Sequence, residues 1–353
     1  MKNEKLISAF TVIIAATVAV SSCKKDKDDT TTPPSVKNIN YPAAYVVNGT
    51  ANNISVIKLL DNTVTETIEL KDATYPHHIY LNPAKTKLAV AITKMDLSGG
   101  HIGHGGMITG QKVQIIDVVT GNIDKEIAVM HLPHNAAFNP SGTELWIPQA
   151  DTMQGHILVY KTSDWSLQNT VNVGKRPSEL TFSFDGSMAF SANTMDGTVS
   201  MIDPNTKAIM QTITVGIDPV GAWPAPNGKM YVDNETSQTI SEIEVMTGTV
   251  TATINLGFKP AYASYSTHHS ELWVTDVTNG NVSRFVNSSG TWIQIGIIPT
   301  GADAHAIVFT SNGEVAYVTN QGANTVSVID VPNLNVIKTI SVGTKPNGIV
   351  FKQ

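Results

Sequence analysis

The residues of this chain alternate between apolar and polar in short runs, and turns that contain glycine or asparagine interrupt these runs. The clearest example combines YVTN at 317–320, TVSVID at 325–330 and VIKTISV at 336–342. Alternation with a period of two is typical of strands that bury one face, and Asn-Gly or Asp-Gly pairs favour tight hairpins. The pattern predicts an all-β protein built from short antiparallel strands.

A unit of four such strands recurs along the chain with a period near 42 residues. In chain order we name its strands A to D. Each A strand follows an anchor position, and the seven anchors are Pro76, Pro133, Pro177, Pro219, Pro260, Ala304 and Pro346. A period of this length with four strands per unit is typical of a β-propeller. The sequence therefore predicts seven four-stranded blades over residues 43–353.

The two ends of this region predict how the ring closes. The region starts with strands B, C and D, at 44–70, and ends with a single A strand at 347–351. Together they make one complete blade, in which the C-terminal strand joins the N-terminal three and leaves no open edge in the ring.

The YVTN and TVSVID segments and VGTKPNGI at 342–349 also resemble the YVTN-type propeller repeat. The resemblance covers roughly the whole of 43–353 and implies the same propeller fold. It implies no particular activity, since propellers of this type occur in proteins with many roles.

The N-terminal segment is of a different kind. Two lysines precede an apolar run at 6–20, which is typical of a signal peptide, and VSSC at 20–23 resembles a bacterial lipobox. We expect cleavage before Cys23, lipidation of this cysteine, and a charged and Thr/Pro-rich tether at 23–42. Because Lys24 follows the cysteine, we expect an outer-membrane lipoprotein, facing the periplasm or the cell surface. Cys23 is the single cysteine of the sequence, so the fold contains no disulfide.

Histidine and methionine gather in two kinds of loop. The residue after the anchor is His77, His134 or His305 in three D–A connections, and the B–C loops hold GGHIGHGGM at 99–107 and QADTMQGHI at 149–157. A propeller places these connections on one face, near the mouth of its channel. We predict a metal site there with a floor of His77, His134 and His305, a glycine-rich flap with His101, His104 and Met107, and a side wall of Met153 and His156.

Imidazole nitrogen combined with thioether sulfur suits copper, whereas histidine alone also suits zinc. We therefore expect a lipid-anchored extracytoplasmic propeller that binds copper, with zinc as the alternative metal, in storage, delivery or sensing. The arrangement loosely resembles the propeller of nitrous oxide reductase, in which histidines around the channel mouth hold a copper cluster. This chain has neither a cupredoxin segment nor a cysteine for an electron-entry site, so the resemblance does not extend to that activity.

Two other classes of function stay open. The face could bind a protein, peptide or glycan partner without metal, or a bound metal could support catalysis. The sequence contains no G-x-S-x-G element and no thiol beyond Cys23, which does not favour an enzyme. A net charge of −6 indicates no nucleic-acid surface, and we expect a monomer.

Overall fold

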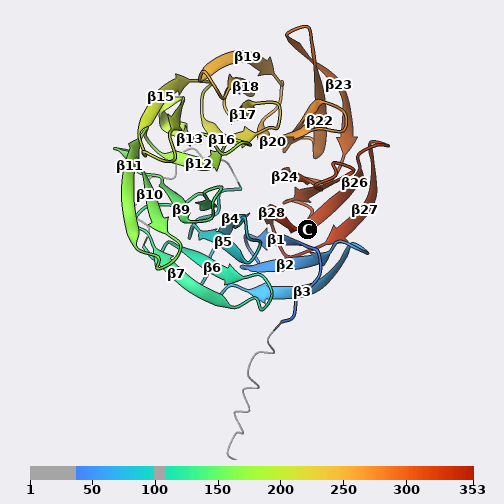
Figure 1. Ribbon diagram of the computed structural model, residues 1–353. Helices are drawn as coiled ribbons and strands as arrows, with labels where there is room; N and C mark the ends of the chain where they lie inside the picture. Colours follow the sequence, from blue (N-terminus) through green and yellow to red (C-terminus); the bar gives the residue numbers. More distant parts are fainter. Residues whose placement is uncertain (1–36, 99–108) are drawn as a thin grey trace, which may run out of the picture. The chain divides into compact units, whose positions relative to one another are not determined.

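The computed structural model describes residues 37–98 and 109–353. The described residues belong to one compact unit, in which seven four-stranded antiparallel sheets stand around a central axis (Figure 1). Within the described residues the helical content is a single 3-10 turn, Thr194–Asp196. The predicted all-β, seven-bladed propeller is confirmed.

The strands follow one another blade by blade, and the innermost strand is the A strand in every case. The first four blades comprise β28 (Pro346–Lys352), β1 (Ala43–Asn48), β2 (Asn53–Lys58) and β3 (Thr63–Glu69); β4 (Pro76–Leu81), β5 (Lys87–Ile92), β6 (Lys112–Asp117) and β7 (Ile123–Ala128); β8 (Ala137–Phe138), β9 (Glu144–Gln149), β10 (Gly155–Lys161) and β11 (Leu167–Val173); and β12 (Pro177–Phe182), β13 (Ala189–Asn193), β14 (Thr198–Ile202) and β15 (Ile209–Thr214). The last three comprise β16 (Pro219–Pro224), β17 (Lys229–Asn234), β18 (Thr239–Glu244) and β19 (Thr249–Asn255); β20 (Pro260–Ser266), β21 (Glu271–Asp276), β22 (Asn281–Ser288) and β23 (Thr291–Pro299); and β24 (Ala304–Phe309), β25 (Val315–Asn320), β26 (Thr325–Asp330) and β27 (Asn335–Ser341).

The first blade combines the two ends of the propeller. Its strand order is β28-β1-β2-β3, and β28 pairs antiparallel with β1 from Ala43 opposite Lys352 to Asn48 opposite Pro346. Strand β1 therefore has a partner on both sides, and the ring contains no blade that lacks its innermost strand.

The core lies between neighbouring blades. The B strands are buried along most of their length, whereas the outermost D strands are largely exposed; β3 and β27 bury one residue each, Ile68 and Ile340. Trp146 and Trp273, on B strands, are completely buried between neighbouring blades. Apolar packing between blades thus supplies the main stabilising energy of the ring.

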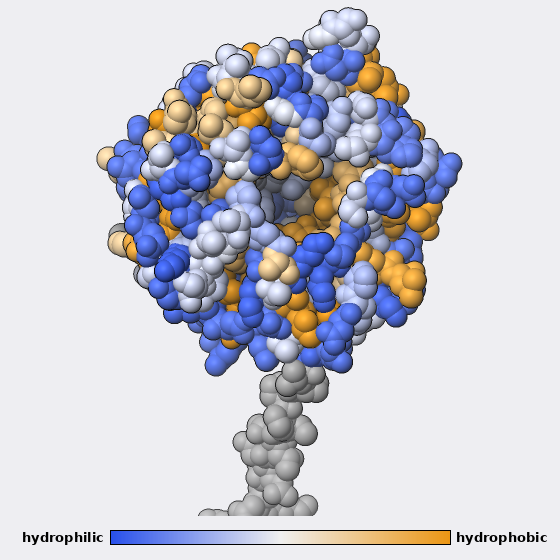
Figure 2. Space-filling view, in the orientation of Figure 1, coloured by the Kyte–Doolittle hydropathy of each residue, from blue (hydrophilic) through white to orange (hydrophobic). Residues whose placement is uncertain are grey.

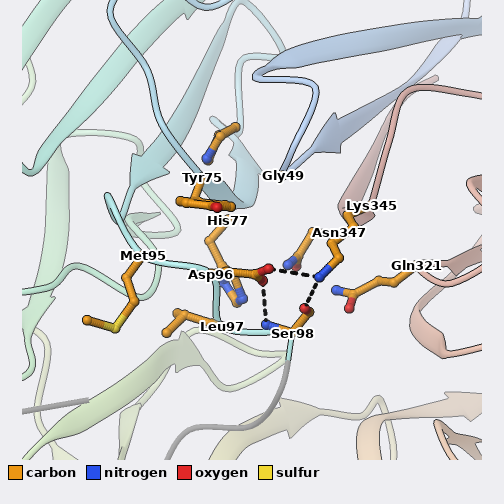
Figure 3. Close-up of a pocket in the computed structure, with 11 residues that line it drawn as sticks. Gly49, Tyr75, His77, Met95, Asp96, Leu97, Ser98, Gln321, Lys345 and Asn347 are labelled. Carbon is orange, nitrogen blue, oxygen red and sulfur yellow. Dashed lines mark hydrogen bonds and ion pairs between the residues drawn. The ribbon is translucent and has the colours of Figure 1, made fainter.

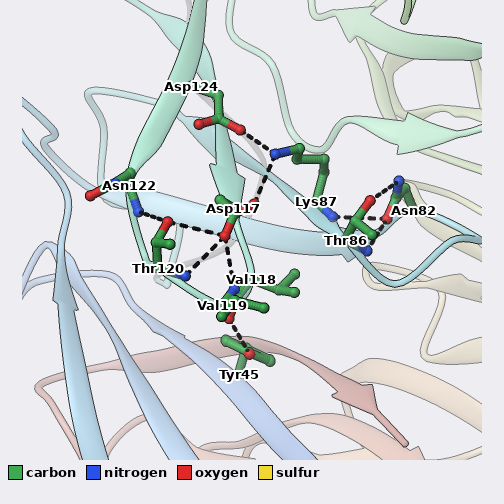
Figure 4. A network of polar contacts seen from close by, with 10 residues as sticks. All are labelled: Tyr45, Asn82, Thr86, Lys87, Asp117, Val118, Val119, Thr120, Asn122 and Asp124. Carbon is green, nitrogen blue, oxygen red and sulfur yellow. Dashed lines mark hydrogen bonds and ion pairs between the residues drawn. The ribbon is translucent and has the colours of Figure 1, made fainter. Parts of the chain in front are cut away.

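Polar contacts at the turns add to this packing. In the second blade the Asp117 carboxylate accepts backbone N–H bonds from Val119 and Thr120 and pairs with Lys87 (Figure 4). The hydroxyl of Tyr45, from the first blade, donates to the carbonyl of Val118 at 2.7 Å. The turn is therefore fixed both within its own blade and against its neighbour.

Candidate metal centre

The A strands share a local irregularity that determines which side chains meet in the channel. In β4, Pro76 lies opposite Ile92 but Ile79 lies opposite Val90, so that one extra residue is inserted after the anchor. Comparable register shifts occur in β12, β16, β20, β24 and β28. A β-bulge interrupts the alternation of faces and redirects side chains. Two consecutive residues after the anchor, His77 and His78 in β4, are both buried as a result.

Four buried imidazoles meet near these bulges, three of them from A strands and one, His134, from the connection that precedes β8. The ring centroid of His77 lies 4.5 Å from that of His78 and 4.4 Å from that of His134, and the rings of His78 and His134 are stacked at 5.0 Å. Each of these three residues offers one ring nitrogen, and the three nitrogens lie within 4.8 Å of one another. His305 is the fourth, with its ring centroid 6.2 Å from that of His77.

Glu179 anchors the cluster from the fourth blade. Its side chain is completely buried, and one carboxylate oxygen lies 2.6 Å from Nδ1 of His134. The other oxygen accepts the hydroxyl of Tyr80 and lies 3.8 Å from Nδ1 of His78. Burial raises the pKa of the Glu179 carboxyl from 4.5 to about 8. The hydrogen bond between Nδ1 and this carboxyl orients the His134 ring and directs Nε2 away from Glu179, as in histidines that bind metals.

The backbone beside this pair is fixed as well. The side-chain NH2 group of Asn135 donates to the backbone carbonyl of Leu180 at 2.7 Å, and the side-chain oxygen of Asn135 accepts the backbone N–H of Leu180 at 3.1 Å. Because His134 precedes Asn135 and Glu179 precedes Leu180, these two bonds hold the imidazole and the carboxyl at their short separation.

Aromatic side chains lie beside the cluster, on the next blades of the ring. The indole of Trp223 stacks on the ring of Tyr262 with centroids 3.6 Å apart, and lies 6.3 Å from the ring of His78. Its Nε1 donates to Asp233 at 2.6 Å, and the backbone N–H of Gly221 donates to the same oxygen. Burial holds the pKa of Asp233 well above its usual range. The imidazoles therefore have a rigid, largely apolar wall on this side.

A small polar pocket adjoins His77 at the mouth of the channel. Its volume is about 10 Å³, which is room for one water-sized group. Figure 2 shows a hollow at the centre of the face drawn. In Figure 3, Asp96 and Ser98 from the loop after β5 face Lys345 and Gln321 across the pocket. This pocket has room for an ion or a water molecule beside His77.

The structure brings together only part of the predicted site. His77 and His134 lie in the cluster, and His305 is a more distant neighbour. Met153 is 81% exposed. His156 lies within strand β10 rather than in a loop, and its Nδ1 contacts the side-chain oxygen of Asn172 at 3.0 Å. The structure thus leaves the predicted side wall of Met153 and His156 outside the cluster.

Two further sets of predicted residues lie outside the described part of the chain. They are the flap residues His101, His104 and Met107, and the lipobox cysteine Cys23. No helix within the described residues is long and apolar enough to cross a membrane.

Sequence reasoning did not place His78 and Glu179 in the site. Both stand two positions after an anchor proline, Pro76 and Pro177. Strict alternation assigns that position to the face opposite the one that carries His77, and the bulge removes this difference. Comparing the second position after each anchor would have found both residues. Trp223, on strand β16, also lies beside the cluster, and it was not among the residues predicted for the site.

No protein-family model matches the sequence, and no curated protein is similar to it in sequence. Solved structures share its fold. A periplasmic gluconolactonase of Pseudomonas aeruginosa is 15% identical with a TM-score of 0.67, covering 88% of this chain and 99% of that chain. Hydrazine synthase of Kuenenia stuttgartiensis is 15% identical with a TM-score of 0.69, covering 86% and 98%. A chain of a mitotic checkpoint complex is 16% identical with a TM-score of 0.66, covering 89% and 97%. Proteins with such different names share only the architecture, so the comparison defines the class, a seven-bladed β-propeller.

Proposed function

We propose that this propeller binds one transition-metal ion through His77, His78 and His134. The observation that carries the proposal is the group of three buried imidazoles whose ring nitrogens lie within 4.8 Å of one another. Metal–nitrogen bonds of ~2.1 Å place the nitrogens of one coordination sphere roughly 3–4 Å apart. The three nitrogens therefore have to approach one another slightly to bind one ion.

The surroundings of the imidazoles support a metal rather than a packing role. A carboxyl on Nδ1 of His134, at 2.6 Å, is the outer partner that metal-binding histidines commonly have. The positive charge of a divalent ion would also attract the buried carboxylate of Glu179 and so stabilise its ionised form.

The set of ligands restricts the metal. Three imidazole nitrogens without a thiolate suit zinc and copper. Copper is our first choice, because the sequence places Met107 in a loop of the same face, and thioether sulfur favours Cu(I). In this proposal His101, His104 and Met107 cover the ion from outside.

Storage, delivery or sensing fits the site better than catalysis. The pocket beside His77 has a volume of about 10 Å³, whereas pockets for small-molecule ligands measure roughly 300–1,000 Å³. For this reason we do not transfer lactone hydrolysis from the gluconolactonase that shares the fold. We further propose that Cys23 carries a lipid and that the propeller lies at the outer membrane, facing the periplasm or the surface, as the lipobox and Lys24 indicate.

Metal analysis of protein purified without a His-tag tests the proposal. We expect one equivalent of copper or zinc after incubation with the metal and removal of the excess, and loss of this equivalent in His78→Asn and His134→Asn. His156→Asn is the matched control, since it makes the same replacement outside the cluster. A wild-type protein that retains no metal, or a control that loses it equally, would refute the site.

A further inference from the structure

The pocket beside His77 contains buried polar groups that the metal cluster does not use. Gln321 is 1% exposed, and neither its side-chain oxygen nor its nitrogen has a hydrogen-bond partner among the described residues. Asn347 is 4% exposed, and its side-chain oxygen is likewise unpartnered there. Buried amides without partners are rare because desolvating them costs free energy. Their presence in one pocket indicates a polar occupant.

A positive charge already stands in this pocket. The ammonium group of Lys345 donates to Asp96 Oδ2 at 2.8 Å and to the hydroxyl oxygen of Ser98 at 2.5 Å (Figure 3). Both side chains of the ion pair are more than a third exposed, so solvent weakens their attraction. The ammonium group thus occupies a position between oxygen ligands that a metal cation could take, and a small free energy is enough to move it.

The same pocket reaches the metal cluster. His77 forms part of its lining together with Asp96, Ser98, Gln321, Lys345 and Asn347. Three of these side chains offer oxygen atoms of the carboxylate and amide kinds, which accept hydrated divalent cations. With a volume of about 10 Å³ the pocket holds at most a water-sized group while Lys345 is in place.

We propose that this pocket is the entry subsite for the metal ion. Asp96, Gln321 and Asn347 receive the incoming divalent cation, Lys345 leaves as the ion arrives, and the ion then passes to His77. Lys345 acts as an internal cation that neutralises Asp96 until it is displaced. This inference rests on the proposed function, because it concerns the route by which the imidazole cluster is loaded.

Stopped-flow absorption with Co²⁺, whose visible spectrum reports binding by imidazole nitrogens, tests the route on the mature protein. In Lys345→Met we expect association to become about fivefold faster, the effect of removing one partly exposed ion pair. We expect dissociation to accelerate by the same factor, so that the equilibrium affinity and the bound spectrum stay unchanged. Gln321→Leu removes an oxygen ligand of the subsite, and we expect slower association without a change of the bound spectrum.

The matched control is Lys87→Met, which breaks an ion pair with Asp117 and Asp124 in the turn network of the second blade (Figure 4). It should load cobalt at the wild-type rate. Equal association rates in wild type, Lys345→Met and Lys87→Met would overturn the entry subsite while leaving the imidazole site intact. A wild-type protein that binds no cobalt, zinc or copper at equilibrium would instead refute the proposed function, and the entry subsite with it.

Discussion

Replacement of Glu179 by glutamine tests two effects of its buried carboxyl, one on folding stability and one on metal affinity. Burial raises the pKa of this carboxyl from 4.5 to about 8. Between these two values the metal-free folded protein keeps the proton, whereas the unfolded chain releases it. The unfolded chain therefore gains stability relative to the folded one as the pH rises through this interval.

The size of the effect follows from the same two values. Each pH unit above 4.5 costs the folded protein about 1.4 kcal/mol, which amounts to roughly 3 kcal/mol at pH 7. Glutamine has nearly the same shape and never ionises. Its oxygen still accepts the hydroxyl of Tyr80, and its NH2 group faces Nδ1 of His134. We expect metal-free Glu179→Gln to be more stable than wild type at pH 7, by up to this amount, with a smaller difference at pH 5.

For metal binding the expected effect has the opposite sign. Glutamine cannot offer a negative charge to the imidazole that holds the ion, and loss of such an outer partner weakens metal affinity by about 10–100-fold. A residue that only fills space would not raise metal-free stability while it lowers metal affinity.

Urea denaturation with a chelator at pH 5, 6 and 7, combined with calorimetric titration of Zn²⁺ or Cu²⁺, measures both effects. Asp185→Asn, at an exposed turn, is a control for loss of one acidic residue. If Glu179→Gln destabilises the metal-free protein equally at every pH, the carboxyl is ionised against a protonated His134, and the reasoning is wrong. Unchanged metal affinity would show that Glu179 has no part in metal binding.

Three further outcomes test the remaining proposals. Cys23→Ser should shift the protein from the membrane to the soluble fraction and prevent lipid labelling; a mutant that fractionates like wild type would contradict the lipid anchor. Deleting residues 346–353 removes β28 and exposes the edge of β1, so we expect aggregation or a large drop in melting temperature by calorimetry, and a wild-type melting curve would contradict the closure of the ring. Joint alanine replacement of His101, His104 and Met107 should speed metal release without abolishing binding, whereas unchanged kinetics in a chelator-competition assay would remove the flap from the site.

The fold was predictable because its signals repeat. Each anchor predicts an A strand, and the alternation of apolar and polar residues then identifies the B, C and D strands. Because the pattern occurs seven times, a wrong strand assignment in one blade is revealed by comparison with the other six. Even Ala304, which replaces the proline, begins strand β24 at the expected register. A repeated pattern of this kind depends on backbone pairing and burial, which are the same in every blade.

The site was predictable only in part, because it depends on differences between blades. The position after the anchor indicated His77 and His134, but the second position carries His78 in one blade and Glu179 in another. Whether such residues meet depends on the bulge, which alternation does not reveal. In the third blade the sequence placed 149–157 in the B–C loop, but strand β10 already begins at Gly155 and includes His156.

Two glycines make room for the imidazoles at this second position. A Cβ on Gly348 would lie 3.0 Å from the backbone nitrogen of Ile79 and 3.1 Å from Cα of His78, so glycine lets β28 approach β4 where it carries the cluster. A Cβ on Gly221 would lie 2.2 Å from the indole of Trp223, so glycine lets that ring lie across the channel. Seven equal side chains of the size of histidine would crowd the axis. At this position some blades carry a large residue and others carry glycine. This difference in side-chain size between blades leaves room for the imidazoles within a repetitive fold.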